Sequence, residues 1–158
     1  MTISQPGYLE KVLHRFGMEN SKPVATPLET GKKFQQLESE QDAFDVQMYQ
    51  QAIGCLTYTS TCTRPDIAAA VGTLAQHMSN PSKGHWVGVK RVLRCLRGTI
   101  NYSLRFQAQQ KPKLVGFAEA DWAGVVDTRR STSGCVPDRR AHCELVQSTT
   151  NNCNQIIH

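Results

Sequence analysis

Basic side chains without acidic neighbours are the feature of this sequence that could most directly do chemistry. Residues 67–118 contain eight lysines or arginines and neither aspartate nor glutamate. Five of these cations cluster at Lys83, Lys90, Arg91, Arg94 and Arg97. At ~100° per residue, all but Arg91 line one face of a helix. Such a row suits the phosphates of a nucleic acid. The alternative is a solvated helix face, but such a face usually mixes charges of both signs.

The segment that carries these cations has the signals of a helix. Asn80 can cap its start, Pro81 suits its first position, and Gly98 can end it. Its apolar side would consist of Trp86, Val89, Val92, Leu93 and Leu96.

Three further helices are expected before it, packed together as a small bundle. The first buries one face at Leu9, Val12, Leu13 and Phe16 and ends at Gly17 in a left-handed cap. The second covers about 45–58 and buries Tyr49, Ala52, Ile53 and Leu56. The third would be capped by Thr63 with Asp66, with Pro65 in its first turn. It would bury Ile67, Ala70, Val71, Leu74 and Met78.

The remaining segments lack a helical pattern. Residues 19–44 are polar, contain Pro23, Pro27 and Gly31, and indicate a long mobile loop. Alternation of Tyr102, Leu104 and Phe106 with polar residues predicts a half-buried strand. Two more strands are expected over 114–119 and 131–136. The fold class is therefore α+β, with about four helices followed by a short antiparallel sheet.

Several short motifs appear in series along most of the chain. They include Ser4-Gln5-Pro6-Gly7-Tyr8-Leu9, Lys22-Pro23-Val24-Ala25-Thr26-Pro27-Leu28, Tyr49-Gln50-Gln51-Ala52-Ile53-Gly54, Arg64-Pro65-Asp66-Ile67, His85-Trp86 and Ala120-Asp121-Trp122-Ala123-Gly124. In this order they resemble the Pol polyprotein of copia-type LTR retrotransposons. The match resembles the thumb and connection of the reverse transcriptase, followed by the first hairpin of ribonuclease H.

The resemblance implies a division of the chain. Residues 1–99 would be the helical thumb and connection region, and 100–137 would begin a ribonuclease H-like domain. Residues 138–158 depart from the family pattern, and we expect this tail to be disordered because its apolar content is low.

Catalysis in this family uses carboxylates that hold two Mg²⁺ ions. The sequence contains no Asp-Asp pair, so the polymerase aspartates of the family have no counterpart here. The resemblance places the first ribonuclease H acid at Glu119, where the family has aspartate, and makes Asp121 the next candidate. The extra methylene of Glu119 would displace its carboxylate by about 1 Å. We therefore expect both acids to be non-functional and no cofactor to be bound.

Three functions stay open at this stage. The first is an inactive Pol fragment that binds the backbone of an RNA–DNA hybrid or DNA duplex through the five cations. The second is a reduced, Mg²⁺-dependent ribonuclease H that uses Glu119 and Asp121. The third is a helical module that binds other Pol segments.

Composition excludes several other classes. Six cysteines occur without a Cys-x-x-Cys pair, so neither a metal site nor a disulfide framework is expected. Cys55 and Cys95 read as small core residues. No apolar run approaches the ~20 residues of a membrane span. The first residues lack the pattern of a secretory signal, so we expect an intracellular protein, cytoplasmic or nuclear, with no membrane partner.

Overall fold

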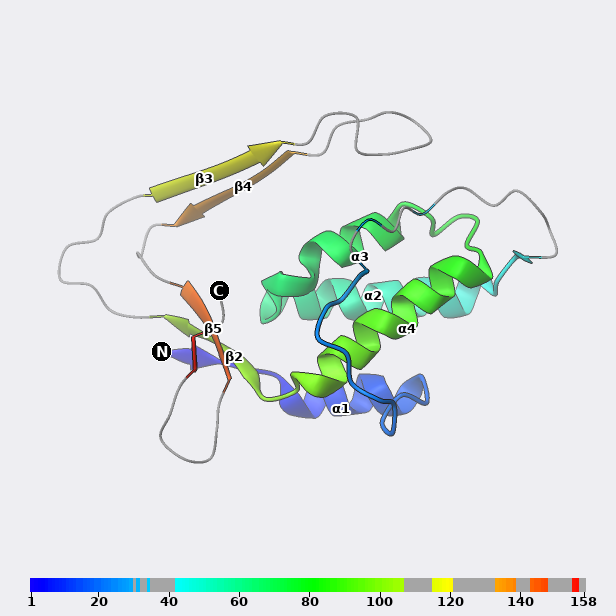
Figure 1. Cartoon of the computed structure of the whole chain (residues 1–158), viewed down its shortest axis with the longest axis horizontal. Coiled ribbons are helices and arrows are strands. Elements are labelled where there is room, and N and C mark those ends of the chain that lie inside the picture. The colour runs from blue at the N-terminus through cyan, green and yellow to red at the C-terminus, as the bar shows by residue number, and fades with distance from the viewer. Residues whose placement is uncertain are drawn as a thin grey trace.

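The structure is a computed structural model, and it describes residues 1–29, 31, 34 and 42–106, followed by four strands that lie between 115 and 156. The four helices are α1 (Pro6–Arg15), α2 (Val46–Cys62), α3 (Ala68–Ala75) and α4 (Lys83–Gly98), and a 3₁₀ turn, η2 (Pro65–Ile67), precedes α3. In Figure 1 α4 lies across the other helices, between α1 on one side and α2 and α3 on the other. Helices and strands together confirm the expected α+β class.

One apolar core joins the helices. Leu9, Val12 and Leu13 of α1 are buried, and Tyr49, Ala52, Ile53 and Leu56 of α2 are almost fully inaccessible. Val89, Val92, Leu93 and Leu96 of α4 complete this core. These are the faces that the 3.6-residue periodicity predicts. Met78 is the exception, because its side chain is 38% exposed and lies outside the core.

The helix ends differ from the sequence expectation in several places. α2 continues to Cys62 where an end at about residue 58 was expected, and α3 ends at Ala75, before Met78. Gly17 has φ of 64°, which confirms the left-handed residue after α1. α4, however, is capped by Ser82 and not by Asn80. The His85 N–H donates to Ser82 Oγ, while the Ser82 N–H donates to His85 Nδ1. A serine–histidine capping box thus replaces the expected Asn–Pro start. The His85 ring is buried and stacks on His77 at 3.9 Å.

The expected cap of the third helix is also wrong. Thr63 ends α2 as its C-cap, and its hydroxyl donates to Gln5 Oε1. Asp66 binds Arg64 instead, accepting from Nε at 2.9 Å and from Nη2 at 2.8 Å. The guanidinium outcompetes a backbone amide because a charged bidentate pair is stronger than a neutral hydrogen bond. Pro65 does occupy the first turn of η2, as expected.

The strands form two antiparallel sheets. β1 (Thr2–Ile3), β2 (Tyr102–Phe106), β5 (Cys143–Gln147) and β6 (Gln155–Ile156) form one sheet, in the order β1-β2-β5-β6. β3 (Val115–Ala120) and β4 (Ser133–Asp138) form the other, close to the two expected strands. In β2 both Ser103 and Leu104 are buried, so the strict alternation expected there does not hold.

The tail differs in part from the expectation of disorder. Within 138–158 the structure has two strands, of which β5 pairs with β2 along its whole length, for example Leu104 opposite Leu145. Hydrogen bonds between strands join backbone groups and do not require apolar side chains. A strand can therefore form here although the tail has few apolar residues. The other residues of 139–158 lie outside the described residues.

Candidate nucleic-acid interface

The core side of α4 fixes where its cations lie. Val89, Val92, Leu93 and Leu96 are fully buried, so the helix cannot rotate about its axis without exposing them. The opposite side carries Lys83, Lys90, Arg91, Arg94 and Arg97, and Lys83 is exposed while the other four are partly accessible. The structure therefore places all five sequence-predicted cations on one helix of 16 residues.

Three of these cations hold the segment that follows α1. Arg94 Nε donates to the carbonyl of Lys22 at 2.7 Å, and Arg97 Nε donates to the carbonyl of Glu19 at 2.7 Å. Arg94 and Arg97 are three residues apart on α4, and Glu19 and Lys22 are three residues apart on the loop. Successive turns of the helix therefore hold successive parts of the loop. In Figure 1 this part of the loop, in darker blue, runs across α4.

Arg91 forms the third link and is paired with a carboxylate. Its Nη1 lies 3.0 Å from Glu29 Oε1, and its Nη2 donates to Thr26 Oγ1 at 3.0 Å. The side chain of Arg91 is 23% exposed and that of Glu29 is 54% exposed. Because charge on Arg91 is balanced locally, it contributes less to an anion site than its neighbours do.

Lys90 differs from the arginines. Its side chain forms no hydrogen bond or ion pair with any residue that the structure describes. Lys83 is exposed in the first turn of α4, where the partial positive charge of the helix end adds to its own. Glu19 and Glu29 are the acids that sequence reasoning missed near this face. They come from the loop, so counting charges along 67–118 could not reveal them.

A cysteine side chain lies buried beneath this face. Cys95 is 3% exposed and its Sγ lies 3.8 Å from the carbonyl oxygen of Ala25. Burial raises the pKa of the Cys95 thiol, which disfavours the thiolate. Cys95 is thus a core residue, as expected, while Cys55 is half-buried.

The candidate acids stand apart from α4 in the sequence. Glu119 lies on β3, paired with Gly134 of β4. Asp121 lies outside the described residues. Among the residues that the structure describes, no group of three histidines, cysteines or acids is placed to hold a metal ion. The proposed roles of Glu119 and Asp121 remain predictions.

The comparisons with known proteins find relatives among the Pol polyproteins of transposons. The chain is 44% identical over 137 residues to the retrovirus-related Pol polyprotein from transposon TNT 1-94 of Nicotiana tabacum, covering 84% of this chain and 10% of the polyprotein. It is 38% identical over 134 residues to the Pol polyprotein from transposon RE2 of Arabidopsis thaliana, covering 85% of this chain and 9% of the polyprotein. A shorter match, 52% identical over 86 residues, is to the secreted RxLR effector protein 161 of Plasmopara viticola, covering 54% of this chain and 61% of that protein. No protein-family model and no solved structure matches.

The two polyproteins define the class of protein to which the chain is related. It is homologous to a segment of retrovirus-related Pol polyproteins from transposons and spans about a tenth of the two polyproteins above. The expectation of a Pol fragment is confirmed at that level. Among the helices of the described part of the chain, none has the length and apolar character to cross a bilayer.

Proposed function

We propose that this chain is the Pol segment that runs from the thumb and connection of the reverse transcriptase into the start of ribonuclease H. We further propose that it binds a nucleic-acid duplex through α4 and catalyses no reaction by itself. Homology to Pol polyproteins supports the first part. The observation that carries the second is the cationic face of α4, a helix of 16 residues that contains no carboxylate.

The contacts of Arg94 and Arg97 suit phosphate binding. Each arginine uses Nε to bind a loop carbonyl, and within the described residues its two terminal nitrogens form no hydrogen bond. The loop thereby orders the side chains before a ligand arrives. Ordering in advance lowers the entropy that binding would otherwise cost. The terminal nitrogens of an arginine match two oxygens of one phosphate.

Affinity of this kind carries little sequence preference. Contacts to phosphate position a protein on a duplex, while base edges supply sequence specificity. We therefore assign phosphate contacts to Lys90, Arg94 and Arg97, with Lys83 at the end of the row. Arg91, neutralised by Glu29, serves to hold the loop in place.

The absence of catalytic activity follows from the small number of acids that could bind the metal ions. Two-metal hydrolysis needs several carboxylates that converge on the ions. The sequence has no Asp-Asp pair, and Glu119 replaces the first aspartate of the resembling family. The displaced Glu119 and Asp121 alone are too few carboxylates to hold two ions.

Salt dependence of binding tests the proposal. The affinity for a fluorescein-labelled 20-base-pair DNA duplex and for the matching RNA–DNA hybrid would be measured by anisotropy between 50 and 200 mM NaCl. For three phosphate contacts we expect a loss of roughly 40-fold across this range. Affinity that is independent of salt would contradict the proposal.

Matched charge reversals locate the surface. Lys90→Glu should weaken binding and reduce its salt dependence, while Lys11→Glu, on the exposed side of α1, should leave both unchanged. Equal losses in the two variants would remove α4 from the interface. Mg²⁺-dependent cleavage of the hybrid, abolished by Glu119→Ala, would overturn the assignment of inactivity.

A further inference from the structure

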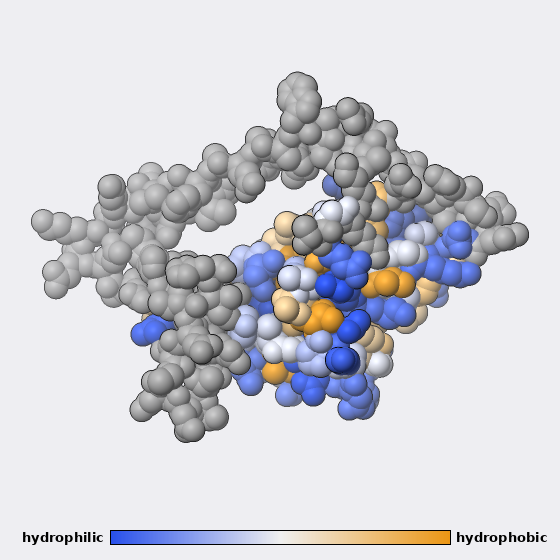
Figure 2. Space-filling model, viewed as in Figure 1, coloured by the Kyte–Doolittle hydropathy of each residue, from blue (hydrophilic) through white to orange (hydrophobic). Residues whose placement is uncertain are grey.

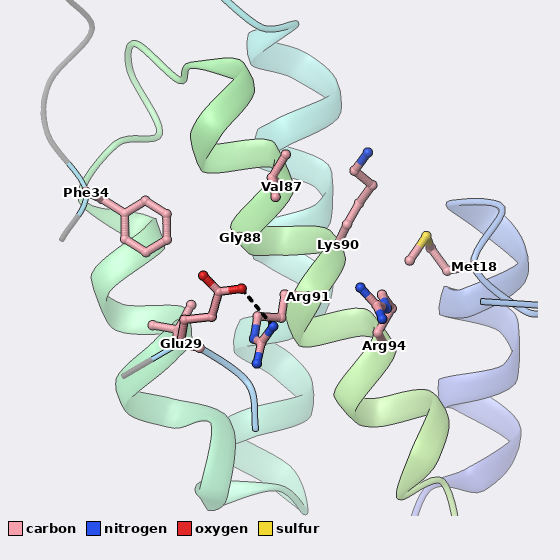
Figure 3. A pocket seen from close by; sticks show the side chains of 9 residues that line it. Met18, Glu29, Phe34, Val87, Gly88, Lys90, Arg91 and Arg94 are labelled. Carbon is pink, nitrogen blue, oxygen red and sulfur yellow. Dashed lines mark hydrogen bonds and ion pairs between the residues drawn. The ribbon is translucent and has the colours of Figure 1, made fainter. Parts of the chain in front are cut away.

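A hollow opens beside the cationic row, between α4 and the loop that follows α1. Its volume is about 250 Å³. Met18, Leu28, Phe34 and Val87 supply apolar surface, and the charged residues that line the hollow are Lys90, Arg94 and the paired Arg91 and Glu29. In Figure 3 Val87, Lys90 and Arg94 project from α4, with Phe34 on one side of this helix and Met18 on the other. Figure 2 shows apolar surface at the centre of this face of the helical body, bordered by hydrophilic residues.

The absence of a side chain at Gly88 shapes this hollow. A Cβ built on Gly88 would lie 2.8 Å from Phe34 Cζ and 2.8 Å from Leu74 Cδ2. Only glycine lets the Phe34 ring lie this close to the backbone of α4. Phe34 is 9% exposed and Met18 is 8% exposed, so one wall is well packed, whereas Val87 is 50% exposed on the open side.

The hollow and its edge together have the chemistry of a nucleotide site. Exposed apolar surface such as that of Val87 accepts the face of a base, and a cation next to it accepts the phosphate. The volume is below the roughly 300–1,000 Å³ typical of sites for drug-sized ligands, so one base fits better than a base pair. Lys90 is the cation without a partner among the described residues, and the terminal nitrogens of Arg94 are similarly available there.

We infer that this hollow takes the base of one unpaired nucleotide from the bound nucleic acid, with its phosphate held by Lys90 and Arg94. The inference rests on the proposed binding of nucleic acid by α4. It adds that the protein distinguishes a strand with an unpaired end from a fully paired duplex. The apolar hollow then contributes affinity that does not depend on salt.

Three DNA ligands separate the inference from the proposed function. The blunt 20-base-pair duplex, the same duplex with a one-nucleotide 3′ adenosine overhang, and the duplex with an abasic overhang would be compared by anisotropy at 100 mM NaCl. The adenosine overhang should bind roughly fivefold or more tightly than the abasic one. Equal affinity for these two, with salt-dependent binding of the blunt duplex intact, overturns the inference alone. No binding of any of the three overturns the proposed function and the inference with it.

A pair of uncharged substitutions tests the location. Val87→Ser removes apolar surface from the hollow, and Val46→Ser removes a comparably exposed valine from the start of α2. Val87→Ser should reduce the preference for adenosine over the abasic overhang toward one, while binding of the blunt duplex is retained. Val46→Ser should keep the full preference. Retention of the preference in Val87→Ser would place the base elsewhere.

Discussion

Arg64 and Thr99, 35 residues apart, are joined by two hydrogen bonds. The guanidinium donates to the carbonyl oxygen of Thr99 at 3.0 Å and to its hydroxyl at 2.6 Å. Its Nε donates to Asp66 Oδ1, and its Nη2, which also binds the Thr99 hydroxyl, donates to Asp66 Oδ2. The Cζ of Arg64 lies 5.2 Å from the ring centre of Tyr102. Arg64 therefore ties the turn before α3 to the end of α4 and the start of β2. This link fixes the end of the helix that carries the cations.

Removal of Asp66 should destabilise the fold strongly. The side chain of Arg64 is 1% exposed, so Asp66→Ala leaves a buried cation without its counter-ion. We expect a loss of about 3 kcal/mol in the free energy of unfolding, measured by urea denaturation. The side chain of Asp66 is 29% exposed, so water can enter where the carboxylate is removed and partly solvate Arg64. The expected loss therefore lies at the lower end of the range for a broken buried ion pair.

Glu29→Ala is the matched control for this ion pair. It breaks the Arg91–Glu29 pair, whose N–O distance of 3.0 Å is similar but whose carboxylate is 54% exposed. An exposed pair should contribute less than about 1 kcal/mol. Equal losses in Asp66→Ala and Glu29→Ala would show that burial of Arg64 has no energetic consequence.

Gly88→Ala should destabilise the protein although alanine favours helices. Its Cβ would approach Leu74 and Phe34 to 2.8 Å, and Leu74 is fully buried and cannot move freely. We expect a loss of about 1–3 kcal/mol. Thermal or urea unfolding would measure it.

The control for Gly88→Ala is Gly72→Ala in α3, where a Cβ meets nothing within 4 Å. This change should stabilise the protein by up to about 1 kcal/mol through helix propensity. The two substitutions should thus have opposite signs. A stabilising Gly88→Ala would contradict the close contact of Phe34 and Leu74 with α4.

Alkaline pH should destabilise the fold through Tyr49. Its buried hydroxyl donates to the carbonyl of Leu74 at 2.8 Å, and burial raises the pKa of Tyr49 above its ordinary value of about 10. The folded state therefore holds a proton that the unfolded state releases near pH 10. The resulting stability is fully present below pH about 10 and is lost as pH rises above it.

Tyr49→Phe isolates this effect. At neutral pH it should cost about 1 kcal/mol, the value of the lost hydrogen bond. Above pH 10 the free energy of unfolding should fall less steeply in Tyr49→Phe than in the parent protein. Burial and a hydrogen bond with Cys55 raise the pKa of the half-buried Tyr8 to about 12. Tyr8 therefore contributes equally to the pH dependence of both proteins. Parallel pH profiles would exclude Tyr49 as the source.

Local sequence patterns predicted the helices well because burial of one face leaves a period of 3.6. Leu9, Leu13, Val92 and Leu96 lie in the core that this period indicates. Cap positions were harder to predict. Asn80-Pro81 has the signals of a helix start, yet Ser82 caps α4 because His85 three residues later completes its hydrogen bonds.

Pairings between distant segments escaped prediction for a different reason. Thr63 and Asp66 have the spacing of a local cap, but Asp66 meets the buried Arg64, which is anchored at Thr99. Nothing in the local pattern around residue 66 encodes a partner at residue 99. In the tail, β5 pairs with β2 and β6 pairs with β5, again through backbone groups that carry no sequence signal.

The sequence alone determined that Lys83, Lys90, Arg94 and Arg97 would share one face of a helix, since helical spacing fixes their angular positions. Only the tertiary structure decided which of the cations on this helix remain available to a ligand. Arg91 meets Glu29, while Arg94 and Arg97 bind carbonyls of Lys22 and Glu19, all on a loop about 70 residues earlier in the chain. The physical reason is that the spacing of side chains along a helix is a local property. Neutralisation of their charge depends on which distant segments tertiary packing places next to the helix.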